Sequence, residues 1–119
     1  MPQIAVDHSA DVLLDVRRFA LAAHALAAEI IGCPPSDCKS RFRPLARTCV
    51  ADGAPHHALA VGEIHILPGR TARTKTALSE ALLTLLADCI TPTPGQRIHL
   101  AWDVVELNPA TYRRADLRG

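Results

Sequence analysis

The sequence is poor in aromatic residues and has no strong excess of charge of either sign. Phe, Trp and Tyr make up 3% of the 119 residues, so the core must be built from aliphatic side chains and alanine. The formal net charge is +1, which gives no reason to expect nucleic acid or an anionic membrane as a partner. A content of 49% hydrophobic and 21% charged residues is typical of a globular chain and excludes a disordered one.

Long hydrophobic runs and metal-binding cysteine spacings are also absent. The most alanine-rich stretch, 19–31, contains His24 and Glu29 and is unsuited to crossing a bilayer. Three aspartates among the first 15 residues exclude the apolar region of a secretory signal. The cysteines at positions 33, 38, 49 and 89 match no zinc pattern. We therefore expect a cytoplasmic protein with reduced thiols, no metal and no membrane partner.

The length suits one domain over residues 1–119, which would hide roughly two-thirds of its unfolded surface. Hydrophobic patterning predicts two halves of similar size, at about 1–55 and 56–109, each with the order strand, helix, strand. Residues 110–119 form a polar tail. The domain is thus expected to have a double β-α-β organisation.

The first half begins with a short alternating strand at 4–7. A helix is expected over about 12–30, where apolar residues recur every three or four positions and a Gly-Cys-Pro-Pro stretch follows as a stop. The stretch 41–50 favours a strand, and Pro44 within it indicates a sheet edge, a bulge or an irregular entry.

The second half carries the clearest strand, 58–67, whose two sides are both largely apolar and therefore predict burial on both faces. A helix over about 71–89 and a strand over 97–107 follow. Right-handed crossovers would make the two strands of each half parallel. The two halves side by side predict an α/β (α+β) fold, with a four-stranded mixed sheet and both helices on one face. Since nothing in the chain covers the other face, we expect an obligate homo-oligomer.

The second residue is a proline, and removal of Met1 would make its nitrogen a secondary amine. A free α-amine has a pKa of about 7.7–8.0, and burial or nearby cations lower this pKa. Pro2 shares an apolar strand face with Ile4, so an amine there could take a proton from carbon at neutral pH. A Met-Pro start is common by itself. The arginine clusters at 41–47 and 70–75 are what make Pro2 a candidate general base.

Four stretches then occur in a specific order along nearly the whole chain: MPQIAVDHS, KSRFR with VADG, ALAVGEIHIL leading into GR, and ELNPATYRR. Together they resemble the tautomerase superfamily, and within it the 5-carboxymethyl-2-hydroxymuconate Δ-isomerases. The resemblance implies a homotrimer of double β-α-β subunits. It also implies an isomerase without a cofactor, in which Pro2 moves a proton 1,3 on an unsaturated carboxylate in homoprotocatechuate degradation.

The resemblance further implies cationic residues that bind the substrate carboxylates. Arg70 is the first candidate, because it follows a predicted strand, precedes a predicted helix and matches a substrate-binding arginine of the family. Arg41 is the second. The family pattern there resembles Arg-Ser-Arg, whereas this chain has Lys39-Ser40-Arg41, so Lys39 would offer a point charge in place of a guanidinium fork. A fixed cation facing the oxygen that gains negative charge would stabilise the transition state.

Other chemistries fit the sequence less well. Glu63 and His65 share a strand face and follow the histidines at 56–57, but no third ligand is specified and no metal site is expected. Nothing fixes the geometry of a cysteine–histidine pair either. Trp102 is expected to pack in the last strand or at a subunit contact, and Tyr112 could reach a neighbouring subunit. The alternatives to the isomerase are a superfamily enzyme acting on another enol or keto acid, and a non-catalytic oligomeric scaffold that binds a small acid.

Overall fold

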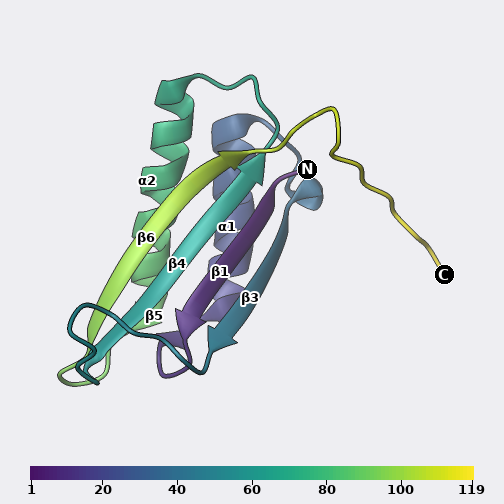
Figure 1. Cartoon of the computed structure of the whole chain (residues 1–119). Helices are drawn as coiled ribbons and strands as arrows, with labels where there is room; N and C mark the ends of the chain where they lie inside the picture. The colour runs from purple at the N-terminus through teal and green to yellow at the C-terminus, as the bar shows by residue number, and fades with distance from the viewer.

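Four strands form one mixed sheet in the order β3-β1-β4-β6 (Figure 1). The computed structural model describes all 119 residues. The strands are β1 (Gln3–Ser9), β3 (Lys39–Leu45), β4 (His57–Ile66) and β6 (Arg97–Glu106). β1 is parallel to β3 and β4 is parallel to β6, whereas the central pair, β1 and β4, is antiparallel. The prediction of two β-α-β units joined in a mixed sheet is confirmed.

The helices α1 (Val16–Ile31) and α2 (Ala72–Asp88) lie together on one face of this sheet (Figure 1). The predicted start of the first helix at residue 12 is wrong, because the Asp15 carboxylate caps the helix by accepting the N–H of Arg18 at 3.1 Å. The helix ends at Gly32, which adopts the left-handed conformation with φ of 72°.

A second, two-stranded sheet was not predicted from the sequence. It pairs β2 (Leu13–Leu14) with β5 (Ile90–Thr91) in antiparallel fashion. The N–H of Asp15 also donates to the carbonyl of Cys89 at 2.9 Å, so the start of α1 is tied to the end of α2. Two-residue strands are too short to give a periodic signal, so the apolar pattern of residues 12–14 predicts an extension of the helix instead.

The core lies between the sheet and the helices and consists mainly of aliphatic residues and alanine, as the composition predicts. Phe19 of α1 is fully buried, with its ring centroid 6.0 Å from that of Phe42 and 5.7 Å from that of Trp102. Trp102 lies over Gly62 on the neighbouring strand, where a Cβ atom would overlap the indole ring. The expected packing role of Trp102 in the last strand is therefore confirmed.

The sheet face opposite the helices, here called the open face, is not covered by any part of the chain (Figure 1). On this face β4 carries Leu59 and Val61 and then Glu63 and His65, of which Val61 and Glu63 are exposed. The expectation that this strand is apolar on both sides is therefore wrong for its second half. β3 is an edge strand, as Pro44 indicated.

Neither helix combines the length and hydropathy that crossing a bilayer would require.

Candidate active site

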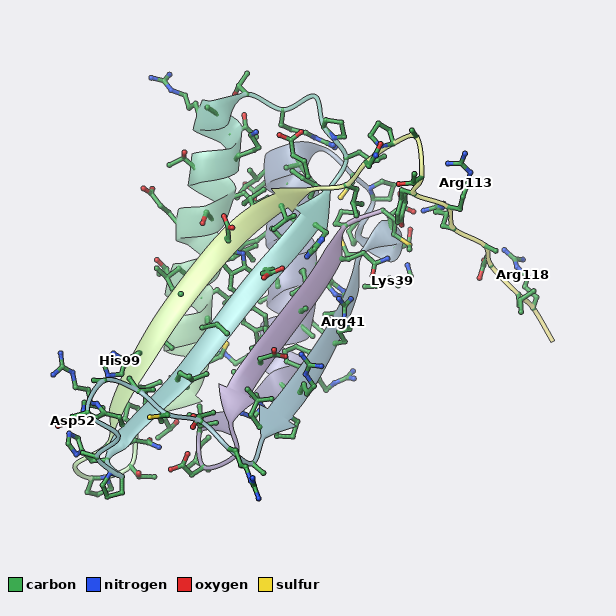
Figure 2. The ribbon with its side chains drawn as sticks, in the orientation of Figure 1. Lys39, Arg41, Asp52, His99, Arg113 and Arg118 are labelled. Atoms are coloured by element: carbon green, nitrogen blue, oxygen red, sulfur yellow. The ribbon has the colours of Figure 1, made fainter.

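The amino-terminal end of β1 brings several of the candidate residues to one end of the sheet. Gln3 pairs with Lys39 of β3 on one side and with His65, near the end of β4, on the other. The segment that carries Arg70 follows β4 directly, so it also starts from this end. Figure 2 shows Lys39 and Arg41 toward this end, whereas Asp52 and His99 lie at the opposite one.

Pro2 is buried at the start of β1. Its carbonyl accepts the N–H of Lys39 at 3.1 Å, which extends the pairing of β1 with β3 by one residue. Ile4 and Val6, which alternate with Gln3 and so share the face of Pro2, are fully buried against the helices. The proline ring is thus anchored both by its own carbonyl and by the apolar layer that continues from it.

A cleft of about 510 Å³ opens beside this end of β1, and we call it the N-terminal cleft. Its lining combines the first residue, the short 3-10 helix η1 (Pro35–Asp37), the start of β3 and the C-terminal tail: Met1, Ser36, Asp37, Lys39, Arg114, Ala115, Asp116 and Arg118. Lys39 Nζ donates to the Ser36 carbonyl at 3.0 Å, and Arg114 Nη1 lies 3.6 Å from Asp37 Oδ1. Three cations and two carboxylates therefore border the cleft.

The sequence interpretation missed the tail arginines of this cleft. The run Arg113-Arg114 and the nearby Arg118 were visible as a basic cluster, but nothing in the sequence tied the tail to the start of β1. The link is the ion pair between Arg114 and Asp37, two residues that are far apart in the chain.

Arg70 is half-buried between the end of β4 and the end of α1. Its Nη1 donates to the Leu67 carbonyl and its Nη2 to the Ile31 carbonyl, each at 3.2 Å. Its remaining N–H groups make no hydrogen bond within the chain, so the guanidinium is held in place with donors to spare. It does not line the N-terminal cleft in this structure.

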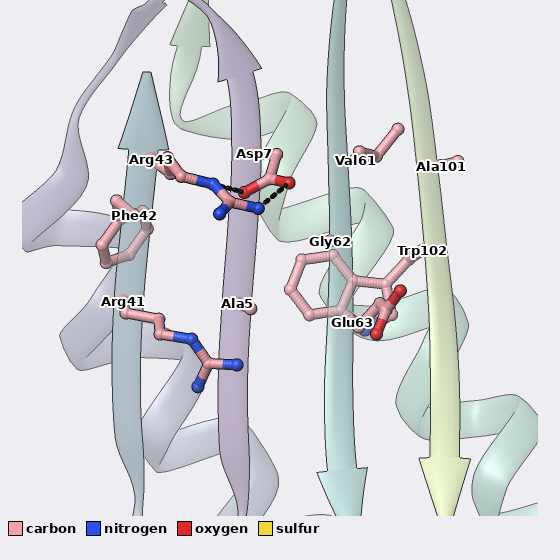
Figure 3. A pocket seen from close by; sticks show the side chains of 10 residues that line it. All are labelled: Ala5, Asp7, Arg41, Phe42, Arg43, Val61, Gly62, Glu63, Ala101 and Trp102. Carbon is pink, nitrogen blue, oxygen red and sulfur yellow. Dashed lines mark hydrogen bonds and ion pairs between the residues drawn. The ribbon is translucent and has the colours of Figure 1, made fainter. Parts of the chain in front are cut away.

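Arg41 lies on the open face, in a shallow hollow of about 560 Å³ (Figure 3). Its Nη1 is 3.5 Å from Gln3 Oε1, and it has no carboxylate partner. The neighbouring Arg43 instead forms a bidentate pair with Asp7, with N···O distances of 3.1 and 2.9 Å (Figure 3). This pairing, through its hydrogen bonds, lowers the pKa of Asp7. Arg41 is thus the unpaired cation of the hollow, on the face opposite the Pro2 ring.

His24 is a second group that the sequence interpretation left aside. It projects from α1 toward the start of β3, where its Nε2 lies 3.1 Å from Ser40 Oγ. Burial first, and the charge of Lys39 second, lower the pKa of His24 below its ordinary value of 6.5. The neutral imidazole of His24 is therefore favoured over the protonated one in the folded protein.

The histidines and Glu63, which the sequence brings close together, lie at the two ends of β4. His65 Nε2 lies 2.8 Å from Glu63 Oε2 near the end of the strand. His57 lies at its start, 3.0 Å from His99 and stacked on His56. No group of three or more His, Cys, Asp or Glu side chains is arranged to hold a metal ion.

The arrangement of two parallel β-α-β pairs around an antiparallel centre is the tautomerase-superfamily fold, and solved structures share it. A 5-carboxymethyl-2-hydroxymuconate isomerase from Deinococcus radiodurans R1 superposes with a TM-score of 0.82 at 15% identity, over 98% of this chain and 90% of that chain. A 5-carboxymethyl-2-hydroxymuconate delta-isomerase gives 0.79 at 15% identity, over 98% and 88%. A member of the cis-3-chloroacrylic acid dehalogenase family, N1, gives 0.72 at 25% identity, over 94% and 79%.

Compared by sequence, the chain matches no protein-family model and no curated protein. The resemblance to the tautomerase superfamily that the sequence indicated is confirmed at the level of the fold.

Proposed function

We propose that the protein is a tautomerase-type enzyme that moves a proton 1,3 on an unsaturated carboxylate such as 5-carboxymethyl-2-hydroxymuconate, with the Pro2 nitrogen as general base. The observation that carries the proposal is the anchored Pro2, whose carbonyl is tied to Lys39 beside a cleft bordered by cations. Two of the solved structures with this fold are isomerases of that compound.

Removal of Met1 is the first requirement of this proposal. Met1 itself lines the N-terminal cleft, so its loss would widen the cleft and leave the Pro2 nitrogen at its wall. Burial of the proline ring and the three cations of the cleft disfavour a protonated amine, whereas Asp37 and Asp116 favour it. We expect burial and the excess of cations to prevail, so the pKa of the freed nitrogen should lie below the usual range of about 7.7–8.0.

The reaction needs only proton transfers and fixed charges. The Pro2 nitrogen takes a proton from a carbon next to the conjugated system, and the electron pair of the broken C–H bond spreads into a dienolate. Negative charge then grows on a substrate oxygen, where a cation stabilises it. The protonated nitrogen returns the proton two carbons along the chain, so that the base is regenerated and the double bond has moved.

Three cations are proposed to bind the substrate. Arg70 is held by two backbone carbonyls and retains donors for a carboxylate. Lys39 borders the cleft and supplies a point charge. Arg41 lies on the open face and would meet a bound substrate only from another copy of the chain, which makes its role depend on a homo-oligomer. A fused 4-OT protein with this fold is described as a symmetric trimer, at a TM-score of 0.70 and 12% identity.

A second candidate keeps the chemistry and changes the substrate. Lys39 stands where the isomerase pattern has an arginine, and the 25% identical N1 structure belongs to a dehalogenase family. The lysine favours a different small acid as the substrate, such as another enol or keto acid, and the N1 likeness shows that this fold also occurs with dehalogenase chemistry. A panel of such acids, assayed beside 5-carboxymethyl-2-hydroxymuconate, separates the two candidates by their kcat/KM values.

The test is ultraviolet monitoring of 5-carboxymethyl-2-hydroxymuconate conversion by protein that mass spectrometry shows to lack Met1. Pro2→Ala replaces the secondary amine with a primary amine and loses the rigid ring, and we expect turnover to fall by roughly 100-fold or more. Pro94→Ala, in an exposed turn before β6, is the matched control and should leave turnover unchanged. If Pro2→Ala retains the full rate, the catalytic amine is refuted. If no acid of the panel is converted, the proposed reaction is refuted for these acids and the non-catalytic scaffold becomes the favoured alternative.

A further inference from the structure

Two cysteines face each other across the loop that joins α1 to β3. Cys33 lies just after α1 and Cys38 just before β3, and their Sγ atoms are 3.9 Å apart. Both are free thiols; Cys38 is buried and Cys33 is half-buried. The remaining cysteines, Cys49 and Cys89, have no such neighbour.

The loop can close this gap without breaking an element of the fold. A disulfide needs an S–S distance of about 2.0 Å, so the two sulfur atoms must approach by about 2 Å. Cys33 and Cys38 both lie outside the regular helices and strands, and only η1 and a preceding proline separate them. Rotation of the two side chains and a small shift of η1 would supply the movement.

We propose that Cys33 and Cys38 are a reversible modification site, at which a hydroperoxide forms an intramolecular disulfide that alters the Pro2 end of the sheet. The first thiolate attacks the O–O bond and becomes a sulfenic acid, and the peroxide oxygen that leaves is protonated. The second sulfur then displaces the hydroxyl as water, and its own proton goes to solvent. With hydrogen peroxide, both sulfurs are oxidised and the peroxide is reduced to two molecules of water.

The two cysteines have different parts in this sequence. Burial first, and then the neighbouring Cys33, raise the pKa of Cys38 to about 11, so Cys38 remains a thiol at neutral pH. Cys33 is the more exposed of the pair and is therefore the sulfur that meets the peroxide. Cys38 is the resolving thiol, already in contact with the sulfur that it must attack.

The same loop holds the residues that border the N-terminal cleft. Lys39 follows Cys38 directly, and its N–H is the donor to the Pro2 carbonyl. Ser36 and Asp37 lie between the two cysteines and bind Lys39 Nζ and Arg114. Drawing Cys38 toward Cys33 would therefore move the anchor of Pro2 and two walls of the cleft. This consequence for turnover rests on the proposed function, whereas the disulfide itself does not.

The experiment treats the full, reduced protein with a small excess of hydrogen peroxide, alkylates the remaining thiols and maps the peptides by mass spectrometry. We expect a peptide linked through Cys33 and Cys38, its loss after dithiothreitol, and its absence in Cys33→Ser and Cys38→Ser. Cys49→Ser, the control, should still form the link. Free thiols throughout, sulfonic acid on Cys33 without a link, or links only between chains would overturn the disulfide.

Turnover measured on the same samples separates the two proposals. We expect peroxide to lower kcat/KM several-fold, dithiothreitol to reverse this loss, and Cys33→Ser not to show it. That result supports control of turnover by the Cys33–Cys38 disulfide. Unchanged turnover in the linked protein overturns that control. Absence of turnover in the reduced protein contradicts the proposed function, while peptide mapping still decides whether the disulfide forms.

Discussion

Pro2 occupies a position where a proline costs the sheet no hydrogen bond. It precedes Gln3, the first residue of β1 that is paired on both sides, and a missing N–H there breaks no rung of the ladder. Its carbonyl still pairs with Lys39. A ring nitrogen at the start of a buried strand is therefore compatible with the fold as well as with the proposed chemistry.

Arg70 offers a test at the scale of a single side chain. Arg70→Ala should lower kcat/KM by roughly 10- to 150-fold, because a hydrogen bond to a charged group contributes about 1.5–3 kcal/mol. Arg73→Ala, in the first turn of α2 and exposed, is the matched control from the same basic cluster. Steady-state kinetics measure kcat/KM for both variants, and Arg73→Ala should keep the parent value. Equal losses of kcat/KM in the two variants would show that only the general positive charge of the cluster is involved.

His24 predicts a pH dependence of stability. Burial and then Lys39 lower its pKa in the folded state, so between that pKa and 6.5 the unfolded chain binds a proton that the folded chain does not. The contribution to the free energy of unfolding is thus complete above about pH 6.5 and falls as the pH drops toward the folded-state pKa.

The check is urea unfolding of the protein and of His24→Gln at about pH 7.5 and about pH 5.5. The variant should lose less stability on acidification than the parent chain does. His56→Gln, at an exposed histidine, should behave like the parent. The same acid-induced loss in the parent and in His24→Gln would remove His24 as the cause.

Among the elements, the packing of β4 against β6 depends on the close approach of the Trp102 ring to Gly62. The Trp102 ring covers Gly62 and leaves no room for a Cβ. Gly62→Ala should therefore destabilise the fold by about 1–3 kcal/mol, because overpacking pushes the ring against Phe19. Denaturant unfolding measures the loss. In the double variant with Trp102→Leu the cost of Gly62→Ala should shrink, and additive losses would mean that the ring is not the obstacle.

The elements also differ in how far the sequence could predict them. β4, β6 and both helices were predicted because their apolar periods extend over many residues, and Thr71 caps α2 at the expected start. The strand expected over 41–50 lies instead at Lys39–Leu45. β2 and β5 could not be predicted, since each is two residues long and gains its pairing only when the helices are in place. Val12 fits the helical period, so the predicted helix starts four residues too early. Its burial has another cause, because Val12 lies directly before the small sheet.

The candidate site was predicted less completely than the fold. Alternation along β1 placed Pro2 on the buried face, and the strand order explains why Lys39 lies beside it. Spacing alone could not show that Arg41 lies on the opposite face from the Pro2 ring. Arg114 reaches the cleft through an ion pair with Asp37, which is distant in the chain, and a single sequence offers no signal for such a pair.

The whole molecule presents an open face that is partly polar. Arg41 and Arg43 line one side of its hollow, and Glu63 lies on β4 across β1 from them (Figure 3). Such a face can pair with copies of itself through opposite charges as well as through Val61, which is 40% exposed.

We therefore predict a homotrimer. Sedimentation velocity at micromolar concentration should give the mass of three chains, and Arg41→Glu should weaken the assembly because it adds a carboxylate to a hollow that already contains Asp7 and Glu63. Arg17→Glu, at an exposed position of α1 on the helix side of the sheet, is the charge-matched control. A monomer of the parent chain under these conditions would contradict the oligomer and with it the proposed role of Arg41.

The central claim is that the freed Pro2 nitrogen is a base at neutral pH. A pH titration by ¹⁵N NMR of the processed protein, labelled at proline, observes this nitrogen directly, because it is the one ring nitrogen that is not an amide. The account predicts a pKa below about 7.7, matched by the acidic limb of kcat/KM against pH. A nitrogen that titrates within the ordinary range, with no corresponding change in rate, would contradict it.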